Sequence, residues 1–372
     1  MNTRTPYLAA LMATALMVPL PLLGLWSSGR LEAHHLEFPP VSHYVDHAAF
    51  SWLAFIAMAI GIVACCLPVI VRVVTSGRKH PTPDVQQPTA NTGRPFPWWG
   101  WAAVAFTAAA WVVAWTRFTW AAPLQSHTFS PLWLGYIGVL SALTWKRKGQ
   151  CLLTAQPLRV LSLFVVSALF WWYFEYLNRF VQNWFYFGVN TFTAPRYFWF
   201  ATLPFATVLP AVLATEEWLS TFPRFSSGLD RWYCVNIRNP RGFAAAWLAA
   251  GVISLMAIGI VPNLLYPLLW ISPLIMVTAG QALAGAPTIF SALRKGNWQR
   301  LYRAAIAALI CGFFWEMWNS HSVAGWTYSV PYVGRFKLFE MPILGFAGYL
   351  PFGLECAVFG KLILKQTGET HA

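Results

Sequence analysis

Long apolar stretches alternate with short polar or Pro-rich segments along almost the whole chain. A helix needs about 20 apolar residues to cross a bilayer, with a range of about 17–25. Ten stretches approach this length, namely residues 7–26, 50–74, 98–116, 129–145, 160–178, 197–219, 243–261, 264–284, 304–319 and 341–364. The pattern therefore predicts an all-α polytopic membrane protein with about ten transmembrane helices.

Composition agrees with a lipid environment. The 372 residues are 58% hydrophobic and only 10% charged, whereas a soluble domain carries about 25% charged residues. The net charge of +13 could suit nucleic acid, but no basic stripe on a soluble face is present to follow phosphates. We therefore expect membrane lipids and no nucleic acid as partners, while the sequence leaves protein partners open.

The basic residues predict an orientation. If the amino terminus is cytoplasmic and each stretch crosses once, most of the 25 Lys and Arg fall on the cytoplasmic side. Six fall outside, namely Arg30, Arg117, Arg179, Arg196, Arg335 and Lys337. The positive-inside rule favours this N-in/C-in topology, and we expect the cytoplasmic (inner) membrane of a bacterium. Arg4 ahead of the first stretch leaves a cleaved signal peptide as an alternative, although the stretch exceeds the usual 7–15 residues.

The helices group as an initial pair followed by two similar sets of four. In each set a Lys-Gly turn (Lys148-Gly149, Lys295-Gly296) precedes a helix ending in Glu-x-x-Asn, then an aromatic outer loop and a helix with prolines. The predicted units are residues 1–74 (helix pair with a His-rich outer loop), 75–97 (flexible cytoplasmic linker), 98–220 (first repeat), 221–242 (basic cytoplasmic loop), 243–365 (second repeat) and 366–372 (cytoplasmic tail). Both copies begin on the same side, which predicts a parallel repeat about an axis along the membrane normal.

Carboxylates inside apolar segments are the first candidates for chemistry, because they are costly in hydrocarbon. Glu175, Glu316 and Glu355 lie in such segments and could act as general acids or bases. Glu175 could instead form an intrahelical pair with Arg179, four residues on. Glu340 lies just before the last apolar stretch, where a negative charge would suit the start of a helix.

Two asparagines and a group of aromatic residues accompany the glutamates. Asn178 and Asn319 follow their glutamates by three residues, so they could orient the carboxyl group or make interhelical contacts. The aromatic rings could line a substrate cavity and stabilise a cation, or they could form an interfacial belt. The candidate substrate-binding residues are Trp315, Trp318, Trp326, Tyr328, Trp184, Tyr186 and Glu340.

The sequence predicts neither a metal nor a cofactor. His43 and His47 have i,i+4 spacing, which metal sites on helices use, but no third ligand stands at a diagnostic spacing. An outer cap held by hydrogen bonds is the interpretation we favour for these histidines. The motifs for nucleotide binding, for α/β-hydrolase chemistry and for c-type haem attachment are missing from the sequence.

The order of a glutamate at a helix end, a W-x-Y loop and a helix with Pro and Glu resembles the intramembrane lycopene-cyclase-type family. The matching residues are Glu175 with Trp184-Phe185-Tyr186 and Glu216-Glu217, and Glu316 with Trp326-Thr327-Tyr328 and Glu355. The resemblance implies a small multi-helix enzyme that cyclises isoprenoids by protonation.

Three hypotheses follow. In the first, the protein is a membrane enzyme acting on an apolar lipid or isoprenoid, with Glu316 and Glu355 as proton donor and partner and Asn319 as the orienting residue. In the second, protonation of the same glutamates drives transport of a lipid or small molecule by alternating access. In the third, the protein is a non-catalytic subunit of a membrane complex, in which the carboxylates pair between helices.

Overall fold

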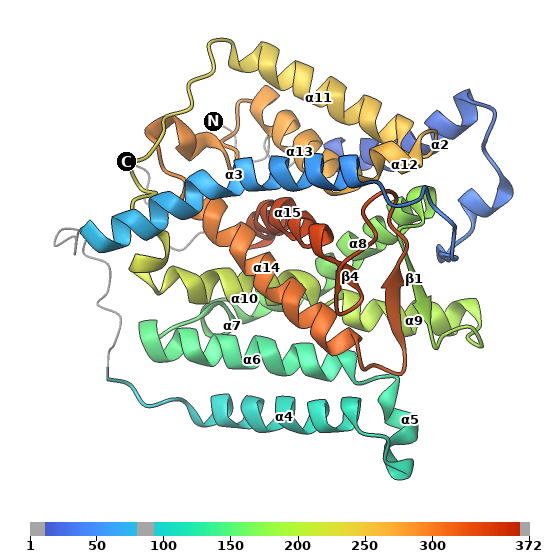
Figure 1. Ribbon diagram of the computed structural model, residues 1–372. Coiled ribbons are helices and arrows are strands. Elements are labelled where there is room, and N and C mark those ends of the chain that lie inside the picture. Colours follow the sequence, from blue (N-terminus) through green and yellow to red (C-terminus); the bar gives the residue numbers. More distant parts are fainter. Residues whose placement is uncertain (1–11, 80–92, 365–372) are drawn as a thin grey trace.

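Helices account for most of the fold in the computed structural model, which describes residues 12–79 and 93–364 (Figure 1). The long unbroken helices are α3 (Trp52–Lys79), α4 (Trp98–Trp115), α6 (Phe129–Lys148), α8 (Pro157–Val181), α11 (Pro240–Ala257) and α14 (Gln299–Asn319). Short helices and 3-10 turns connect them, namely α2 (Pro19–Ser27), η1 (Ala33–Leu36), η2 (Thr119–Ala121), α5 (Ala122–Gln125), α7 (Leu152–Ala155), η3 (Pro223–Ser226) and η5 (Ser291–Lys295).

Other helices follow one another in tandem. They are α9 (Ala194–Phe205) with α10 (Val208–Ser220), then α12 (Pro262–Leu265) and η4 (Tyr266–Trp270) with α13 (Ser272–Leu283), and η6 (Ile343–Gly348) with α15 (Tyr349–Ile363). Within the described residues, seven helical segments are long and apolar enough to cross a membrane, or eight if the α12–α13 pair forms one span. The chain is thus a helical multi-pass membrane protein.

Three of the ten predicted spans differ from the expectation. Helix α6 is not among the segments that are apolar enough, and it ends in three basic residues. The predicted span 264–284 is bent by 51° at its break, because Pro267 and Pro273 cannot donate the backbone hydrogen bonds that a continuous helix needs. In the first stretch, only the shorter helix Met12–Ser27 lies within the described residues.

Several predicted boundaries differ from those in the structure or lie outside the described residues. Helix α3 continues to Lys79, so the first residues of the predicted linker 75–97 are helical. Residues 80–92 of that linker and the predicted tail 366–372 lie outside the described residues, as do residues 1–11, where a signal peptide was an alternative.

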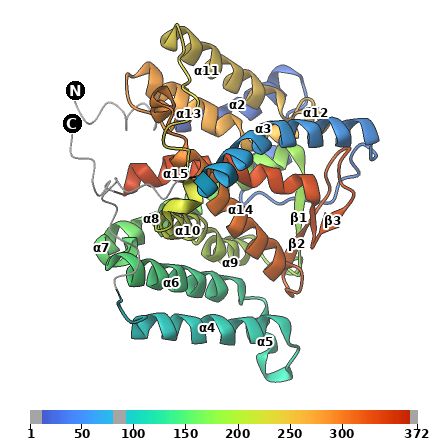
Figure 2. The same ribbon diagram turned by 60° about the vertical axis from the view of Figure 1, so that its left-hand side comes forward.

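Two helix pairs lie on opposite sides of a central group. Helix α4 packs on α6 along one side and α11 packs on α13 along the other, in both views (Figures 1 and 2). Between them lie α8, α10, α14 and α15, and α2 packs on α11. The two helices that end in Glu-x-x-Asn, α8 and α14, are therefore central.

Helix α3 is attached mainly at its ends. Just before its amino-terminal end, the Ser51 N–H donates to the Tyr332 carbonyl at 2.9 Å. Toward its carboxyl-terminal end, Arg72 Nε donates to the Gly228 carbonyl at 2.9 Å. None of its most apolar window is buried in the protein, so its long middle section is free to face lipid on one side.

The aromatic outer loops contain short strands, which the all-α prediction did not include. Strand β1 (Trp184–Phe187) pairs with β2 (Gly325–Tyr328), and β3 (Lys337–Leu338) pairs with β4 (Met341–Pro342), both antiparallel. Aromatic residues favour extended backbone where their rings pack on neighbours. The first of these strand pairs joins two segments that are far apart in the sequence.

Candidate functional site

The two W-x-Y motifs form a ladder with each other. Trp184 lies opposite Tyr328, and Tyr186 lies opposite Trp326. At the centre, Phe185 faces Thr327, and these are the middle residues of the two motifs. The register therefore relates the motifs by a local two-fold rotation through the central pair.

Asn178 and Asn319 hold the two strands rather than the glutamates. The Asn178 amide donates to the Trp184 carbonyl at 2.7 Å, and the Asn319 amide donates to the Trp326 carbonyl at 2.7 Å. The side-chain oxygen of Asn319 accepts from the Trp326 N–H at 2.8 Å. A Cβ on Gly325 would lie 2.4 Å from that oxygen, which explains a glycine there. The sequence predicts that these asparagines orient the carboxyl groups. In the structure they instead fix each strand to its helix.

Glu175 is 2% exposed and accepts three hydrogen bonds on one carboxyl oxygen. Tyr186 donates to it at 2.5 Å, Trp184 Nε1 at 3.0 Å and Trp171 Nε1 at 2.9 Å. The alternative pairing of Glu175 with Arg179 is not formed, because the Arg179 guanidinium donates to the carbonyls of His35 and Glu37 in the outer loop. Glu175 therefore faces the aromatic interior of the protein.

Glu316 is fully buried and has a different set of donors. Tyr328 donates to Oε1 at 2.6 Å and Tyr349 donates to the same oxygen at 2.8 Å. Trp326 Nε1 donates to the Tyr328 hydroxyl at 2.7 Å. The second carboxyl oxygen, Oε2, is buried without a hydrogen-bond partner among the described residues.

One cavity of about 810 Å³ connects the two glutamate sites. Its lining includes Tyr186, Tyr328 and Tyr349, whose hydroxyl groups bind the two glutamates. Indole rings complete much of the wall, namely Trp171, Trp184, Trp270, Trp315 and Trp326. Both carboxyl groups are buried, and each contacts the cavity wall through the hydroxyl of a lining tyrosine.

Helix α3 forms another part of the cavity wall. The lining residues of this helix are Met58, Gly61, Ile62, Cys65 and Cys66, which recur at helical spacing on one face. The cavity thus lies between the central helices and a helix whose outer side is exposed.

Glu355 does not belong to this site. It is fully buried in α15, and its Oε1 accepts the Leu274 N–H at 3.1 Å, at the start of α13. Its Oε2 is buried without a hydrogen-bond partner among the described residues. The carboxyl group therefore caps the first turn of α13 after the break in that span, whereas Glu316 is bound by Tyr328 and Tyr349.

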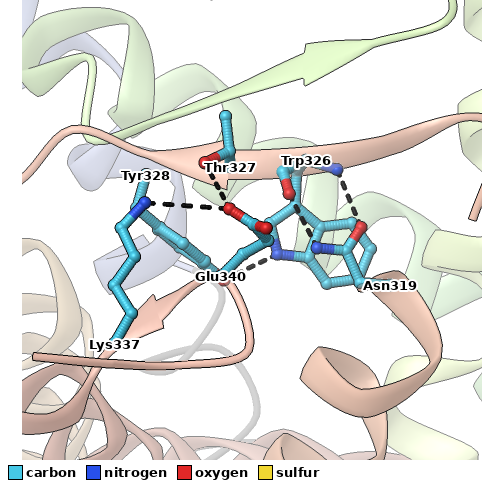
Figure 3. A network of polar contacts seen from close by, with 6 residues as sticks. All are labelled: Asn319, Trp326, Thr327, Tyr328, Lys337 and Glu340. Atoms are coloured by element: carbon cyan, nitrogen blue, oxygen red, sulfur yellow. Dashed lines mark hydrogen bonds and ion pairs between the residues drawn. The ribbon is translucent and has the colours of Figure 1, made fainter. Parts of the chain in front are cut away.

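Glu340 lies in the turn of the β3–β4 hairpin and not at the start of a helix (Figure 3). Its Oε2 accepts the Thr327 hydroxyl at 2.9 Å and lies 3.7 Å from Lys337 Nζ. The side chain is 37% exposed. Glu340 thus fastens the hairpin to the centre of the W-x-Y ladder, since Thr327 belongs to β2.

The remaining aromatic candidates divide into two groups. Trp315 lines the cavity, whereas Trp318 packs with Trp133 and Trp111, at ring-centre distances of 5.1 and 5.8 Å, on the α4–α6 side. Of the substrate-binding candidates, the rings of the two W-x-Y motifs and Trp315 therefore share one cavity, and Trp318 belongs to the packing between helices.

The candidate metal ligands His43 and His47 lie in the segment between η1 and α3. Residues 40–51 are not helical, so His43 and His47 do not have the geometry of an i,i+4 helical pair. The two His47 ring nitrogens lie 3.0 Å from Asn263 Oδ1 and 3.1 Å from the Gln182 carbonyl. Across the described residues, no three His, Cys, Asp or Glu side chains gather as a possible metal site.

Sequence reasoning missed two features of the site, Tyr349 and the wall made by α3. Tyr349 carries no motif, and its contact with Glu316 depends on how α15 packs on α14. A usable signal was present in Gly312, one turn before Glu316, because a Cβ there would lie 2.4 Å from the Tyr349 ring. Trp171 stands at the same spacing before Glu175.

Comparisons with protein-family models, with curated proteins and with solved structures give no match for this chain.

Proposed function

We propose that this protein is an intramembrane enzyme that isomerises or cyclises an apolar, isoprenoid-type lipid by acid–base chemistry. One observation carries the proposal: Tyr186 and Tyr328 each contact a buried glutamate and line the same cavity. A cavity of about 810 Å³ falls in the range of about 300–1,000 Å³ typical of small-molecule sites. The resemblance to the lycopene-cyclase-type family adds to this support.

The reaction would move one proton into the substrate and one out of it. One glutamate gives its proton to a bridging tyrosine oxygen while that tyrosine passes its own proton to a carbon of a substrate double bond. The neighbouring carbon becomes a carbocation, which the indole rings of the wall stabilise through cation–π attraction. The other glutamate, through its own tyrosine, removes a proton from an adjacent carbon, and the C–H electrons form a new double bond. The product has the same formula as the substrate.

The lining of the cavity favours an apolar substrate that arrives from lipid. Most lining residues are aliphatic or aromatic, and the polar groups are concentrated at the two glutamate sites. One face of helix α3 lines the cavity and its opposite face is exposed. Hydrogen bonds hold the helix near both of its ends. The route of entry in this proposal runs from the bilayer past the middle of α3.

The same proposal includes an N-in/C-in protein of ten spans in a bacterial inner membrane, with a parallel four-helix repeat. In support of the orientation, Arg147, Lys148 and Arg303 bind the segment after α10, at residues Thr221, Ser220 and Ser226. In support of the repeat, equivalent residues of the two W-x-Y motifs pair about a local two-fold axis.

The test uses purified full-length protein in lipid vesicles, to which total isoprenoid lipids of the host are added. Expected is the loss of one lipid and the gain of an isomer of equal mass, abolished in Glu175→Gln and in Glu316→Gln. Tyr266→Phe is the matched control, because Tyr266 lines the cavity but has no hydrogen-bond partner for its hydroxyl among the described residues. If no lipid changes in mass or isomer composition, and a proton-coupled lipid flux is found instead, the enzyme proposal is wrong and a transporter is favoured.

A further inference from the structure

The two glutamate sites differ in which helix carries a large aromatic side chain, the helix with the glutamate or the helix that follows it. Trp171 stands four residues before Glu175, and Gly312 stands four residues before Glu316. The Leu-Pro pairs of the following helices are preceded by Val208 in the first set and by Tyr349 in the second. The first site therefore has Trp on the glutamate helix and Val opposite, and the second has Gly on the glutamate helix and Tyr opposite.

This exchange changes the chemistry of the hydrogen bonds. Of the three donors to Glu175, two are indole N–H groups, which can donate but never accept. Such fixed donors require an acceptor, so they favour the carboxylate form, and hydrogen bonds to a charged group are stronger than those to a neutral one.

The donors to Glu316 are both hydroxyl groups, which can donate or accept. Trp326 Nε1, the counterpart of Trp184 Nε1, donates to the Tyr328 hydroxyl. Oε2 of Glu316 is buried with no hydrogen-bond partner among the described residues. A buried, unpaired carboxylate oxygen is costly, and the neutral carboxyl form avoids that cost.

We propose that Glu316 carries the proton and Tyr349 delivers it to the cavity, while Glu175 is the carboxylate that receives a proton. The direction of proton transfer in this assignment rests on the proposed function, but the protonation states do not. Tyr349 is suited to delivery because it lines the cavity and its hydroxyl contacts Glu316. Gly312 leaves the space that the Tyr349 ring occupies.

Infrared spectroscopy tests the protonation states directly, since a protonated carboxyl group has a carbonyl stretch that a carboxylate lacks. Purified protein in vesicles at pH 7 is compared with Glu316→Gln, Glu175→Gln and Glu355→Gln. Expected is a protonated-carboxyl signal with a component that disappears in Glu316→Gln and persists in Glu175→Gln. The Glu355→Gln spectrum identifies any component that the second buried glutamate contributes. Loss of the component in Glu175→Gln but not in Glu316→Gln overturns the assignment.

Tyr349→Phe tests the role of the hydroxyl. The Glu316 component is expected to shift, because the hydrogen bond between its carboxyl group and the Tyr349 hydroxyl is lost, whereas Tyr266→Phe leaves it in place. If lipid conversion is present, Tyr349→Phe is expected to lower kcat about 10²-fold or more, the lower end of the general-acid contribution, with little change in KM. An unshifted component, or an unchanged kcat, overturns the role of Tyr349. Absence of conversion in every variant, with the infrared shifts as expected, refutes the proposed function but leaves the protonation states standing.

Discussion

Glu316 and Glu355 are both fully buried in the last two long helices, yet their surroundings differ in kind. Glu316 is bound by two side-chain hydroxyls that also line a large cavity. Glu355 is bound by a backbone N–H at the first turn of α13. Burial of a carboxyl group in a membrane helix therefore does not by itself mark a reactive site, and the identity of its donors separates a group exposed to chemistry from one that holds a helix.

The largest expected effect is a difference in the rate of lipid conversion between variants of Glu316 and Glu355. Glu316→Gln is expected to reduce lipid conversion by about 10²–10⁴-fold, the usual contribution of a general acid or base. Glu355→Gln keeps an oxygen for the Leu274 N–H and is expected to change conversion by less than a few fold. Conversion rates of the purified variants in vesicles check this contrast, and equal losses in both variants would contradict it.

The next effect concerns the residue that fixes the strand beside Glu316. Asn319→Ala removes partners from the N–H and the C=O of Trp326, at a cost of about 1–3 kcal/mol for each group left unpaired. We expect a clear fall in the thermal unfolding temperature in detergent and loss of conversion together. Asn239→Ala is the matched control, because Asn239 caps the exposed start of α11 and its loss costs about 1 kcal/mol. A smaller effect for Asn319 than for Asn239 would refute the strand-holding role.

The third prediction tests whether Glu355 stabilises the start of α13. Glu355→Leu leaves the Leu274 N–H unpaired in the interior, at a cost of about 1–3 kcal/mol, whereas Glu355→Gln retains the acceptor. Thermal unfolding of the two variants should therefore differ, with Gln closer to the original protein. If Leu is as stable as Gln, the cap on α13 contributes nothing measurable.

The smallest effect is expected at Glu340, which shares the carboxyl chemistry but is partly in water. Its contacts with Thr327 and Lys337 lie at the surface, where exposed ion pairs are worth about 0.2–1 kcal/mol. Glu340→Gln should thus change stability within that range and leave substrate affinity nearly unchanged. A large rise in KM would instead restore Glu340 as a substrate-binding residue.

The membrane class and most helix positions could be predicted from the sequence, because hydrophobic stretches of sufficient length have few alternatives in lipid. The break in the predicted span 264–284 could also have been anticipated from Pro267 and Pro273. What the pattern could not supply was the antiparallel pairing of β1 with β2, since two four-residue aromatic segments far apart in sequence carry no register signal. That pairing is also what forms one cavity wall from both motifs.

The sequence pattern also could not predict which of the buried glutamates contacts the cavity wall. Glu355 and Glu316 have similar apolar neighbours in sequence, and only the packing of α15 against α13 and α14 assigns one to Leu274 and the other to the tyrosines. Asn178 and Asn319 follow their glutamates by three residues in the sequence, but no hydrogen bond joins them to the carboxyl groups among the described residues. Their true partners are backbone groups six or seven residues ahead, which become close only when the chain turns back from the helix into the strand.

The ladder between β1 and β2 has a consequence for chains that would contain a single copy of the unit. Because each motif pairs with its equivalent through the central residues Phe185 and Thr327, the edge that one copy presents is complementary to itself. A shorter protein with one such unit would leave that edge open, and two identical molecules could close it through an isologous contact.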